Sequence, residues 1–385
     1  MTARDLLFTL LRFEIASTPF PKDLVETIDN DTMAEVVTIA QRHSIAHLIA
    51  DAVEKNNLPV QESLAKFLKK QKQIVVMRYI QMDEMLKRIK NVLNEAKIPY
   101  IPLKGVVMQQ YYPEAWMRNS CDMDILVYKE DLQKANDLLV TRLQFKKVAQ
   151  CSHDISYSFG SVHVELHFEL LEDDWANNAR QVLKNVWEYS KNREGTFEYI
   201  MDEEFFYFYH IAHMVKHMKS YGIGLRHFID LWILNENLSY DVEYEQSLLS
   251  KCDLQNFEKE AYILTKNWFE LTEETSLTNR IEEYVLNSGT YGNKENYVDI
   301  HKSPEKSKFQ YFFSRLFLPY KEMSRIYPIL KKLKFLLPCF WLWRCILIIA
   351  SPSKFKDGVQ EMRYVQQMHP DKEKWKKELM LELHI

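Results

Sequence analysis

The sequence predicts an α+β fold in which a small mixed sheet lies between large helical regions. Three observations support this prediction. Apolar residues recur at helical spacing through residues 1–97 and again after residue 175. Between these regions, residues 122–127 and 162–169 alternate polar and apolar side chains with the period of two that is typical of strands. The chain has 385 residues and is 46% apolar, which is enough for two or three packed domains.

The central region, residues 98–172, contains the predicted sheet. The short apolar run IPYIPLKG predicts a first strand that ends near Gly105, and VVMQQYY predicts a helix. DMDILV predicts a second strand, and KEDLQKANDLLVTRL predicts a second helix. FKKVAQ, HDISYSF and SVHVELHFEL predict three further strands. The expected order is therefore strand, helix, strand, helix and three strands.

The flanking regions are predicted to be helical. Residues 1–97 form an N-terminal helical region, and residues 173–287 form a second one, with helices expected in WANNARQVLKNVWEYS, EEFFYFYHIAHMVKHMKS and LRHFIDLWILNEN. The polar stretch 288–308 is predicted to be a linker. Residues 309–385 form a basic and aromatic C-terminal region that we also expect to be helical.

Composition excludes several classes of function. Lys and Arg number 50 against 54 Asp and Glu, a net charge of −4, so we expect no duplex nucleic acid as a partner. Eight glycines form neither G-x-G-x-x-G nor G-x-x-x-x-G-K-[ST], which argues against a Rossmann dinucleotide site and a P-loop. Five cysteines without C-x-x-C argue against a disulfide framework and a thiolate zinc site. The N-terminal segment is amphipathic rather than typical of a signal peptide, so we expect a cytoplasmic location.

The strongest chemical signal is the D-M-D of the second predicted strand. Side chains alternate along a strand, so Asp122, Asp124 and Leu126 share one face, while Met123, Ile125 and Val127 share the other. The two carboxylates then lie about 7 Å apart. Two hard oxygen ligands on one rigid face suit Mg²⁺, although D-x-D alone is also compatible with the solvated edge of a sheet.

A third carboxylate follows in SVHVELHFEL. Its apolar residues are expected to face inward, and these are Val162, Val164, Leu166 and Phe168. Its polar residues are expected to face outward, and these are His163, Glu165, His167 and Glu169. Glu165 is flanked by apolar residues, which makes it the natural third acid of the site.

Lys104 and Gly105 stand between an apolar strand and a helix. A glycine lets backbone approach a phosphate, and a helix N-terminus favours anions, to which Lys104 adds positive charge. An ordinary strand-to-helix turn would explain these two residues equally simply.

In combination these motifs resemble a known family. The order Leu103, Lys104 and Gly105, then YYP and Arg118, then D-h-D-h-L-V, then h-E-L-H resembles the DNA polymerase beta-like nucleotidyltransferase superfamily. More narrowly, the chain is similar to a bacterial family of predicted nucleotidyltransferases that carry LKG, R-x-x-x-D-h-D-h-L-V, VELH and a later H-x-x-H-x-x-x-H helix. The resemblance covers about residues 99–235, and a basic, aromatic tail extends it to about residue 350.

The resemblance implies a role for each motif. Asp122, Asp124 and Glu165 would hold two Mg²⁺ ions, with Mn²⁺ as an alternative metal, and Glu165 would also act as the general base for an acceptor hydroxyl. Gly105 would admit the β- and γ-phosphates. The residues that would contact the nucleotide are Lys104, Gly105, Arg118, His167, His213, Lys216, His217 and Arg226.

Two features depart from the superfamily. Its signature is commonly h-G-[GS], but Val106 follows Gly105 here, so the usual serine contact to phosphate is absent and Lys104 or Arg118 is expected to replace it. The separation of 17 residues between Gly105 and Asp122 (122 − 105) is also longer than usual.

Histidines form a further candidate group. His210, His213 and His217 stand at i, i+3 and i+7, on one stripe of a predicted helix, and His227 lies on the next helix. Such a stripe suits packing, phosphate contacts or zinc. Arg226 and Asp230 on the second helix are spaced for an ordinary i, i+4 salt bridge.

The C-terminal region carries a basic, apolar segment. Residues 321–356 contain eight Lys or Arg residues and a single acid, Glu322, and FLLPCFWLWRCILIIA is nearly all apolar. This run is too short and too interrupted for a membrane span. Either it docks on the core of the protein, or it lies peripherally on a membrane with anionic lipid.

The sequence as a whole therefore predicts a Mg²⁺-dependent nucleotidyltransferase. It would transfer a nucleoside monophosphate from an NTP, with ATP as the expected donor, to a hydroxyl of an unknown acceptor and release pyrophosphate. One alternative is a nucleotide-binding module without catalysis. Another is a metal-dependent hydrolase built on His163, His167, His210 and His213.

Overall fold

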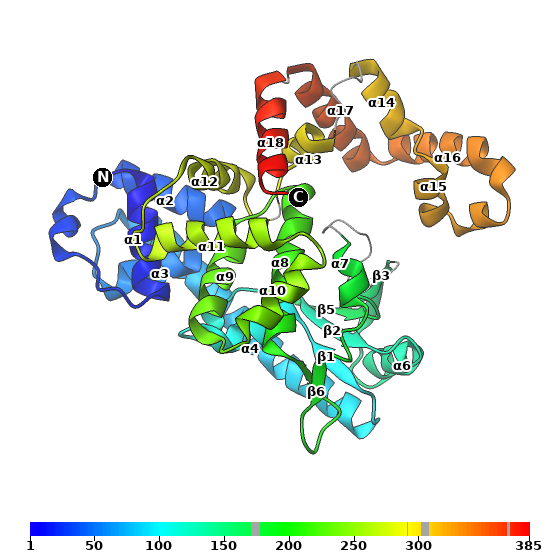
Figure 1. Ribbon diagram of the computed structural model, residues 1–385, viewed down its shortest axis with the longest axis horizontal. Coiled ribbons are helices and arrows are strands. Elements are labelled where there is room, and N and C mark those ends of the chain that lie inside the picture. Colours follow the sequence, from blue (N-terminus) through cyan, green and yellow to red (C-terminus); the bar gives the residue numbers. More distant parts are fainter. Residues whose placement is uncertain (152, 171–177, 291, 302–307, 368–369) are drawn as a thin grey trace.

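We describe the protein from a computed structural model, which describes residues 1–385 except 152, 171–177, 291, 302–307 and 368–369 (Figure 1). The fold is α+β, as predicted, with a small mixed sheet covered by helices from both the N-terminal and the later parts of the chain.

The N-terminal region is helical, as predicted. Side chains cap two of its helices, because Thr2 and Asp5 form a capping box at the start of α1 and the Asp29 carboxylate accepts the Thr32 N–H at the start of α2. Its elements are α1 (Ala3–Ile15), η1 (Lys22–Thr27), α2 (Asn30–Arg42), α3 (Ala46–Lys55) and α4 (Glu62–Glu95). Helix α4 runs along the sheet and contacts β5.

The sheet contains five strands in the order β1-β2-β5-β4-β3. The strands are β1 (Tyr100–Pro102), β2 (Met123–Val127), β3 (Lys146–Gln150), β4 (Asp154–Phe159) and β5 (Val162–His167). The helical elements between them are α5 (Lys104–Met108), η2 (Gln109–Tyr111), η3 (Ala115–Met117) and α6 (Leu132–Thr141). β2 and β5 are parallel, and the other neighbouring pairs are antiparallel. The predicted order of strands and helices is confirmed.

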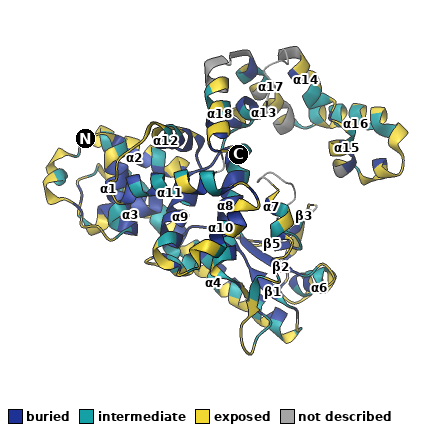
Figure 2. Ribbon diagram, in the orientation of Figure 1, coloured by how far each residue is buried: buried dark blue, intermediate teal, exposed yellow. Residues whose placement is uncertain are grey.

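The two faces of the sheet belong to different cores. Met123, Ile125 and Val127 pack with the α4 and α6 side chains, whereas Leu126 belongs to the large core formed with the later helices. The predicted division of β2 into two faces is thus confirmed. Asp124 shares the face of Leu126, so it points toward the helices rather than toward solvent. Figure 2 shows how completely β1 and β2 are buried.

Helices follow the sheet, with one deviation from prediction. They are α7 (Ala179–Leu183), α8 (Glu203–Lys219), α9 (Leu225–Asn237), α10 (Val242–Ser250), α11 (Gln255–Phe269) and α12 (Ser276–Ser288). The helix expected across residues 175–190 is short, and its first three residues lie outside the described part of the chain. A hairpin of β6 (Ser190–Asn192) and β7 (Tyr199–Met201), which the sequence did not suggest, packs beside β1. It buries the Glu198 side chain against Lys90 of α4, at 2.6 Å.

The C-terminal region is helical, as predicted. It contains α13 (Lys294–His301), α14 (Lys308–Leu316), α15 (Tyr320–Ile326), η4 (Pro328–Lys331), η5 (Lys334–Leu336), α16 (Leu337–Ala350), α17 (Pro352–Gln367) and α18 (Pro370–Glu382). Helices α14 to α17 stand away from the sheet, while α18 returns to α12 and α13 (Figure 1). Within the described residues, no helix combines the length and the apolar character needed to cross a membrane.

The segment predicted as a polar linker is partly helical. Helix α13 occupies residues 294–301 because its polar side chains find partners: the Asn296 amide donates to the Ser288 hydroxyl, and Lys376 of α18 pairs with buried Asp299 at 2.6 Å. The remaining boundaries between the predicted regions stay predictions.

Candidate active site

One cavity of about 230 Å³ gathers the predicted site residues. It lies between the ends of β2 and β5 and the helices α8 and α9. All eleven residues predicted as catalytic, metal-binding or nucleotide-binding line it: Lys104, Gly105, Arg118, Asp122, Asp124, Glu165, His167, His213, Lys216, His217 and Arg226. The residues thus meet in space, although more than a hundred positions separate the first from the last.

Two parallel strands bring the carboxylates together. Asp124 of β2 and Glu165 of β5 are paired in the parallel register, so their side chains leave the sheet side by side on the same face. His167 lies two residues further along β5, and its Nε2 is 2.9 Å from Asp124 Oδ1 and 3.4 Å from Glu165 Oε2. The three side chains form the carboxylate cluster of the cavity.

The prediction that His167 faces outward was wrong in one respect. Its face of β5 is indeed opposite to the apolar one, but helices cover that face, and His167 is buried. Only His163, at the other end of the same strand, is exposed. The alternation of the sequence could identify the face but not what covers it.

Charges inside the cluster shift the pKa values in opposite directions. Burial and the nearby charge of Asp124 raise the pKa of Asp122, which immediately precedes β2. Although burial alone would raise the pKa of Asp124, the charge of Lys104 and the hydrogen bond with His167 hold it well below its usual range. Burial also opposes the charge on His167, yet its bonds to Asp124 and Glu165 outweigh burial and raise its pKa. Asp124 is therefore a fixed anion with cationic neighbours.

Lys104 is held beside this anion by the backbone. The Leu103 N–H donates to the Asp124 carbonyl at 2.9 Å, and the Lys104 Nζ lies 3.5 Å from Asp124 Oδ2. Lys104 has a φ of 44°, a left-handed conformation that is uncommon for a residue with a side chain. Such conformations concentrate at functional sites, where the surrounding structure maintains them.

Gly105 has a close neighbour that the sequence did not suggest. A Cβ at this position would lie 2.6 Å from Ser120 Oγ, so only glycine lets this hydroxyl approach the start of α5. The Ser120 hydroxyl also donates to the Asp122 carbonyl at 3.0 Å. A serine therefore does lie against the glycine, but it comes from the loop before β2 rather than from the position after Gly105.

Arg118 connects the sheet to the helices. Its Nε donates to Asp230 Oδ1 of α9 at 2.7 Å, and both side chains are buried, with 7% and 1% of their side-chain surfaces exposed. Tyr112 donates to the same Asp230 oxygen. Asp230 thus pairs with Arg118 instead of with Arg226, whose guanidinium donates to the Asn119 carbonyl.

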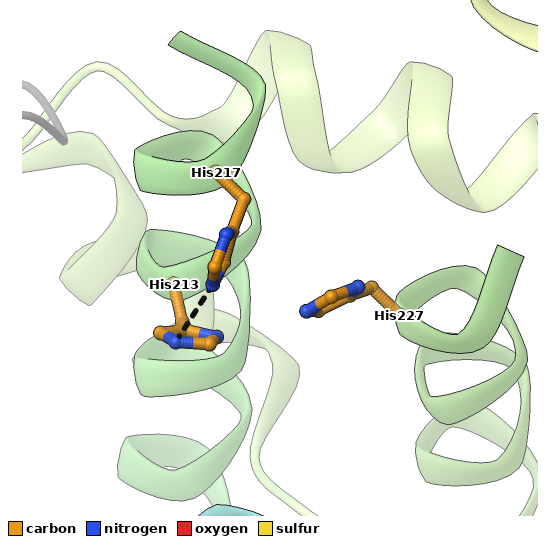
Figure 3. A group of neighbouring side chains, drawn as sticks. All are labelled: His213, His217 and His227. Carbon is orange, nitrogen blue, oxygen red and sulfur yellow. Dashed lines mark hydrogen bonds between the residues drawn. The ribbon is translucent and has the colours of Figure 1, made fainter. Parts of the chain in front are cut away.

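Three histidines form a second group on the opposite wall. His213 and His217 of α8 face His227 of α9 (Figure 3), and one nitrogen from each lies within 4.8 Å of the others. The two Nε2 atoms of His213 and His217 are 3.2 Å apart. Burial, followed by nearby positive charges, lowers the pKa of all three, that of His217 to about 3. We call these residues the histidine cluster; its imidazoles are neutral at pH 7.

The other histidines of the predicted stripe behave differently. His210 lines the cavity, but its Nε2 bonds to the His227 carbonyl at 3.0 Å, which joins α8 to α9. His163 is exposed and is not part of the cavity. The four histidines considered for a hydrolase therefore do not gather at one point.

Further residues of the cavity had weak sequence signals. Ser120, Tyr209, His227 and Asp230 line it, and among them only Asp230 and His227 could be placed near the site, from their spacing to Arg226. Nothing in the sequence relates Ser120 to Gly105, because the fold of the fourteen intervening residues, which include η2 and η3, brings them together.

The carboxylate cluster fits a hard divalent cation. Ligand atoms of Asp124, Glu165 and His167 lie within 4.8 Å of one another, with Asp122 beside them. Carboxylate oxygens are the protein ligands that Mg²⁺ prefers. A cation would relieve the repulsion from Asp124 that, together with the larger effect of burial, raises the pKa of Asp122. The donor set is thus compatible with the metal that the sequence predicts.

A mixed sheet that presents carboxylates from adjacent parallel strands, next to a glycine turn, defines a core of the nucleotidyltransferase class. The model of a protein family described as uncharacterised nucleotidyltransferase matches residues 29–270, and the chain belongs to this family. No curated protein and no solved structure matches the chain. The family match includes α4, the five-stranded sheet, α8 and α9 and ends before α12, so the cavity residues on these elements lie within it, whereas Thr290 of the lining does not.

Proposed function

We propose that the protein is a Mg²⁺-dependent nucleotidyltransferase that transfers a nucleoside monophosphate from an NTP, with ATP as the expected donor, to a hydroxyl acceptor. The observation that carries this proposal is the composition of the cavity. Three carboxylates, Asp122, Asp124 and Glu165, line it together with four cationic side chains, which are Lys104, Arg118, Lys216 and Arg226. The carboxylates suit a metal, and the cations suit a triphosphate.

Each group has a distinct task in this proposal. Mg²⁺ held by Asp122, Asp124 and Glu165 would neutralise charge on the phosphates and favour ionisation of the acceptor hydroxyl. Gly105 lets the triphosphate approach the backbone at the start of α5, where Ser120 supplies the hydroxyl that the sequence lacks after the glycine. Lys104 and Arg226 bind phosphate oxygens, and His167 orients Asp124 through its hydrogen bond.

The reaction is an in-line displacement at the α-phosphorus. The acceptor oxygen forms a bond to this phosphorus, while the bond from the phosphorus to the oxygen that bridges to the β-phosphate breaks. Pyrophosphate leaves with that oxygen, and the proton of the acceptor passes to Glu165. The Glu165 side chain is 34% exposed, so it is accessible from the cavity, in contrast to Asp124 at 6%.

Calorimetric titration of each NTP tests the nucleotide site. We expect binding that requires Mg²⁺ in the wild type, and at least about tenfold weaker binding in an Asp122→Asn, Asp124→Asn double variant. The matched control is Asp137→Asn, which changes an exposed carboxylate on α6; this variant should bind the nucleotide like the wild type. Equal binding by the double variant and the wild type would contradict the assignment of the carboxylates.

Labelled NTP separates transfer from mere binding. With a cell extract as the source of acceptor, label at the α-phosphate should move to a product, whereas label at the γ-phosphate should appear in pyrophosphate. Transfer of the γ-label instead would indicate a kinase. Binding without movement of either label would leave the chain as a nucleotide-binding module.

A further inference from the structure

The histidine cluster has the properties of a second metal site. We infer that His213, His217 and His227 bind a transition-metal ion of the zinc class, at a site separate from the carboxylates. This part of the inference is independent of the proposed function, because it concerns only the three imidazoles and the ion.

The spacing of the nitrogens supports this inference. Zn²⁺ binds imidazole nitrogens at about 2.0–2.1 Å in tetrahedral sites, which places two ligand nitrogens about 3.3 Å apart. The Nε2 atoms of His213 and His217 are 3.2 Å apart and share a hydrogen bond, and His227 points toward them from α9 (Figure 3). A metal ion would take the place of the proton between these two nitrogens. Two histidines at i and i+4 on one helix and a third from a neighbouring helix are a common arrangement of three zinc ligands.

The chemistry of the groups favours zinc over phosphate as the ligand. A metal requires imidazoles without a proton on the ligating nitrogen, and the surroundings of these three, of which His227 is buried and His213 and His217 are half-buried, favour the neutral form. Neutral imidazoles add no positive charge for a phosphate. The Nδ1 atom of His227 is moreover buried and has no hydrogen-bond partner in the described part of the protein.

Nearby positive charges do not exclude a cation. Lys104, Lys216 and Arg226 lie near the histidine cluster, and with Arg118 they give the cavity four cationic side chains. Asp122, Asp124, Glu165 and Asp230 supply four carboxylates in the same lining. The charges of these eight side chains therefore balance, so the cavity does not carry a large excess of positive charge that would repel the ion.

The two sites select different ions. Carboxylates prefer hard cations such as Mg²⁺, whereas imidazoles suit zinc and its neighbours in the first transition row. Three protein ligands leave a fourth position open toward the cavity. If the proposed function holds, this position takes a phosphate oxygen of the bound nucleotide. Met214 follows His213 at the position where the H-E-x-x-H helix of a zinc protease carries its catalytic glutamate, so the cluster lacks the general base of that hydrolysis.

The zinc content of tag-free protein tests this site. After dialysis against Zn²⁺ and then against buffer, we expect about one zinc per chain in the wild type. His217→Gln and His227→Gln should each weaken zinc binding by more than about 100-fold, because they remove a ligand. Exposed His163→Gln should retain zinc, and so should the Asp122→Asn, Asp124→Asn double variant.

A second readout covers the case in which the histidine variants do not fold. Co²⁺ added to the wild type should give the intense visible absorption of a tetrahedral site, and Zn²⁺ should abolish it. Wild-type protein without zinc and without this absorption would overturn the inference. Binding of Mg²⁺ and NTP without zinc would overturn only this inference, whereas zinc binding without NTP binding would overturn only the proposed function.

A separate observation concerns the outer surface of α16. The geometry points to a peripheral contact of this helix with a membrane that contains anionic lipid. One side of α16 packs on the small core of Leu318, Met323 and Leu330, and the Trp341 indole donates to the Leu318 carbonyl at 2.9 Å. This fixes which side of the helix is free.

The free side is apolar. All residues of α16 are described, and none of its side chains is buried. Leu342, Ile346 and Ile349 form a stripe at i, i+4 and i+7 and are 64%, 56% and 70% exposed, next to half-exposed Trp343. The side chains that lead into the helix, Lys331, Lys332 and Lys334, are exposed as well.

This combination of apolar stripe and lysines identifies the partner. Burial of the stripe in a lipid interface removes it from water, and the lysines complement anionic headgroups. α16 is too short to span the membrane, so the contact is peripheral. We call the stripe with its lysines the lipid-facing surface.

Vesicle flotation of the full chain tests this contact. We expect at least about tenfold more binding to vesicles of phosphatidylcholine and phosphatidylglycerol than to phosphatidylcholine alone, and a decrease with salt. Leu342→Glu with Ile346→Glu should abolish binding. Ile200→Glu replaces an equally apolar, 49% exposed side chain on β7 and should have no effect. Equal flotation of the wild type and the α16 variant would overturn the proposal.

Discussion

The two walls of the cavity carry opposite kinds of chemistry. The sheet wall presents Asp124, Glu165 and His167, a charged cluster of two carboxylates with an imidazole whose pKa is raised. The helix wall presents the histidine cluster, whose pKa values are lowered because burial is not compensated by a carboxylate partner. The same side chain, histidine, is therefore favoured as a cation on one wall and neutral on the other.

This difference shows that the environment, not the residue type, determines which charge state of histidine is favoured on each wall. On the sheet, adjacent parallel strands place an acid next to His167 by register alone. On the helices, the histidines lie next to each other and next to buried cations. One cavity can thus offer a hard-cation site and a nitrogen site a short distance apart.

The largest expected effect follows from breaking the connection between the walls. Asp230→Asn removes the charge that pairs with Arg118 and leaves the buried guanidinium without its counter-ion. Removal of one partner of a buried ion pair costs about 3–5 kcal/mol, so we expect the free energy of unfolding to fall by this amount. Urea unfolding measures this decrease. Asparagine is the suitable replacement because it keeps the shape of the side chain and still accepts the hydrogen bond from Tyr112.

Asp137→Asn again serves as the control, because its carboxylate is exposed and should change stability by less than about 0.5 kcal/mol. If Asp230→Asn were equally mild, Arg118 would have another partner, and the two walls would not depend on this pair.

The sequence predicted the sheet wall better than the helix wall, for a physical reason. The alternation of DMDILV and VHVELH identifies which carboxylates share a face, because strand periodicity is local. The partners of α8 and α9 depend on how helices pack, which local patterns do not encode. Spacing suggested a pair of Arg226 and Asp230, but Asp230 lies against Arg118, which is 112 residues away.

The same reason explains the deviations elsewhere in the chain. Ser120 reaches Gly105 only through the fold of an intervening loop, and His167 is buried only because helices cover its face of β5. The hairpin of β6 and β7 has strands of only three residues each, which are too short to show the apolar alternation that makes strands recognisable.

A smaller effect is expected from disturbing the glycine turn of the sheet wall. Gly105→Ala places a Cβ 2.6 Å from Ser120 Oγ and 3.1 Å from Ser120 Cβ, and such overpacking costs about 2 kcal/mol. Ser120→Ala removes the hydroxyl, so Gly105→Ala should cost clearly less in that background. A double-mutant cycle with thermal unfolding measures this coupling. Strictly additive effects would show that the clash is not the cause.

The smallest effect concerns the neutral histidines behind the helix wall. His43 is buried, its Nδ1 accepts the N–H of Leu225 at the start of α9, and its Nε2 donates to the Leu286 carbonyl. Burial lowers the pKa of His43 to about 4, so the unfolded chain takes up the proton first as the pH falls below about 6.5. The stability that His43 provides is therefore complete above this pH and decreases on acidification, by about 1.2 kcal/mol between pH 7 and pH 5.5.

The stability that His167 provides should depend on pH in the opposite direction to that of His43. The pKa of His167 is raised in the folded protein, so its contribution to stability is present below about pH 6.5 and is lost as the pH rises through the pKa of the folded state.

Urea unfolding at pH 5.5, 7 and 8.5 compares the wild type with His43→Gln and His167→Gln. The loss of stability caused by His43→Gln should become smaller on acidification, because His43 stabilises the wild type fully only above about pH 6.5. The loss caused by His167→Gln should become smaller at high pH, because His167 stabilises the wild type fully only below about pH 6.5. The comparison of variants matters more than the wild-type curve, since buried Glu14 and Glu245, with the pKa raised to about 7 mainly by burial, oppose the effect of His43. Parallel pH curves for the two variants would mean that the pKa values of His43 and His167 are not shifted in opposite directions.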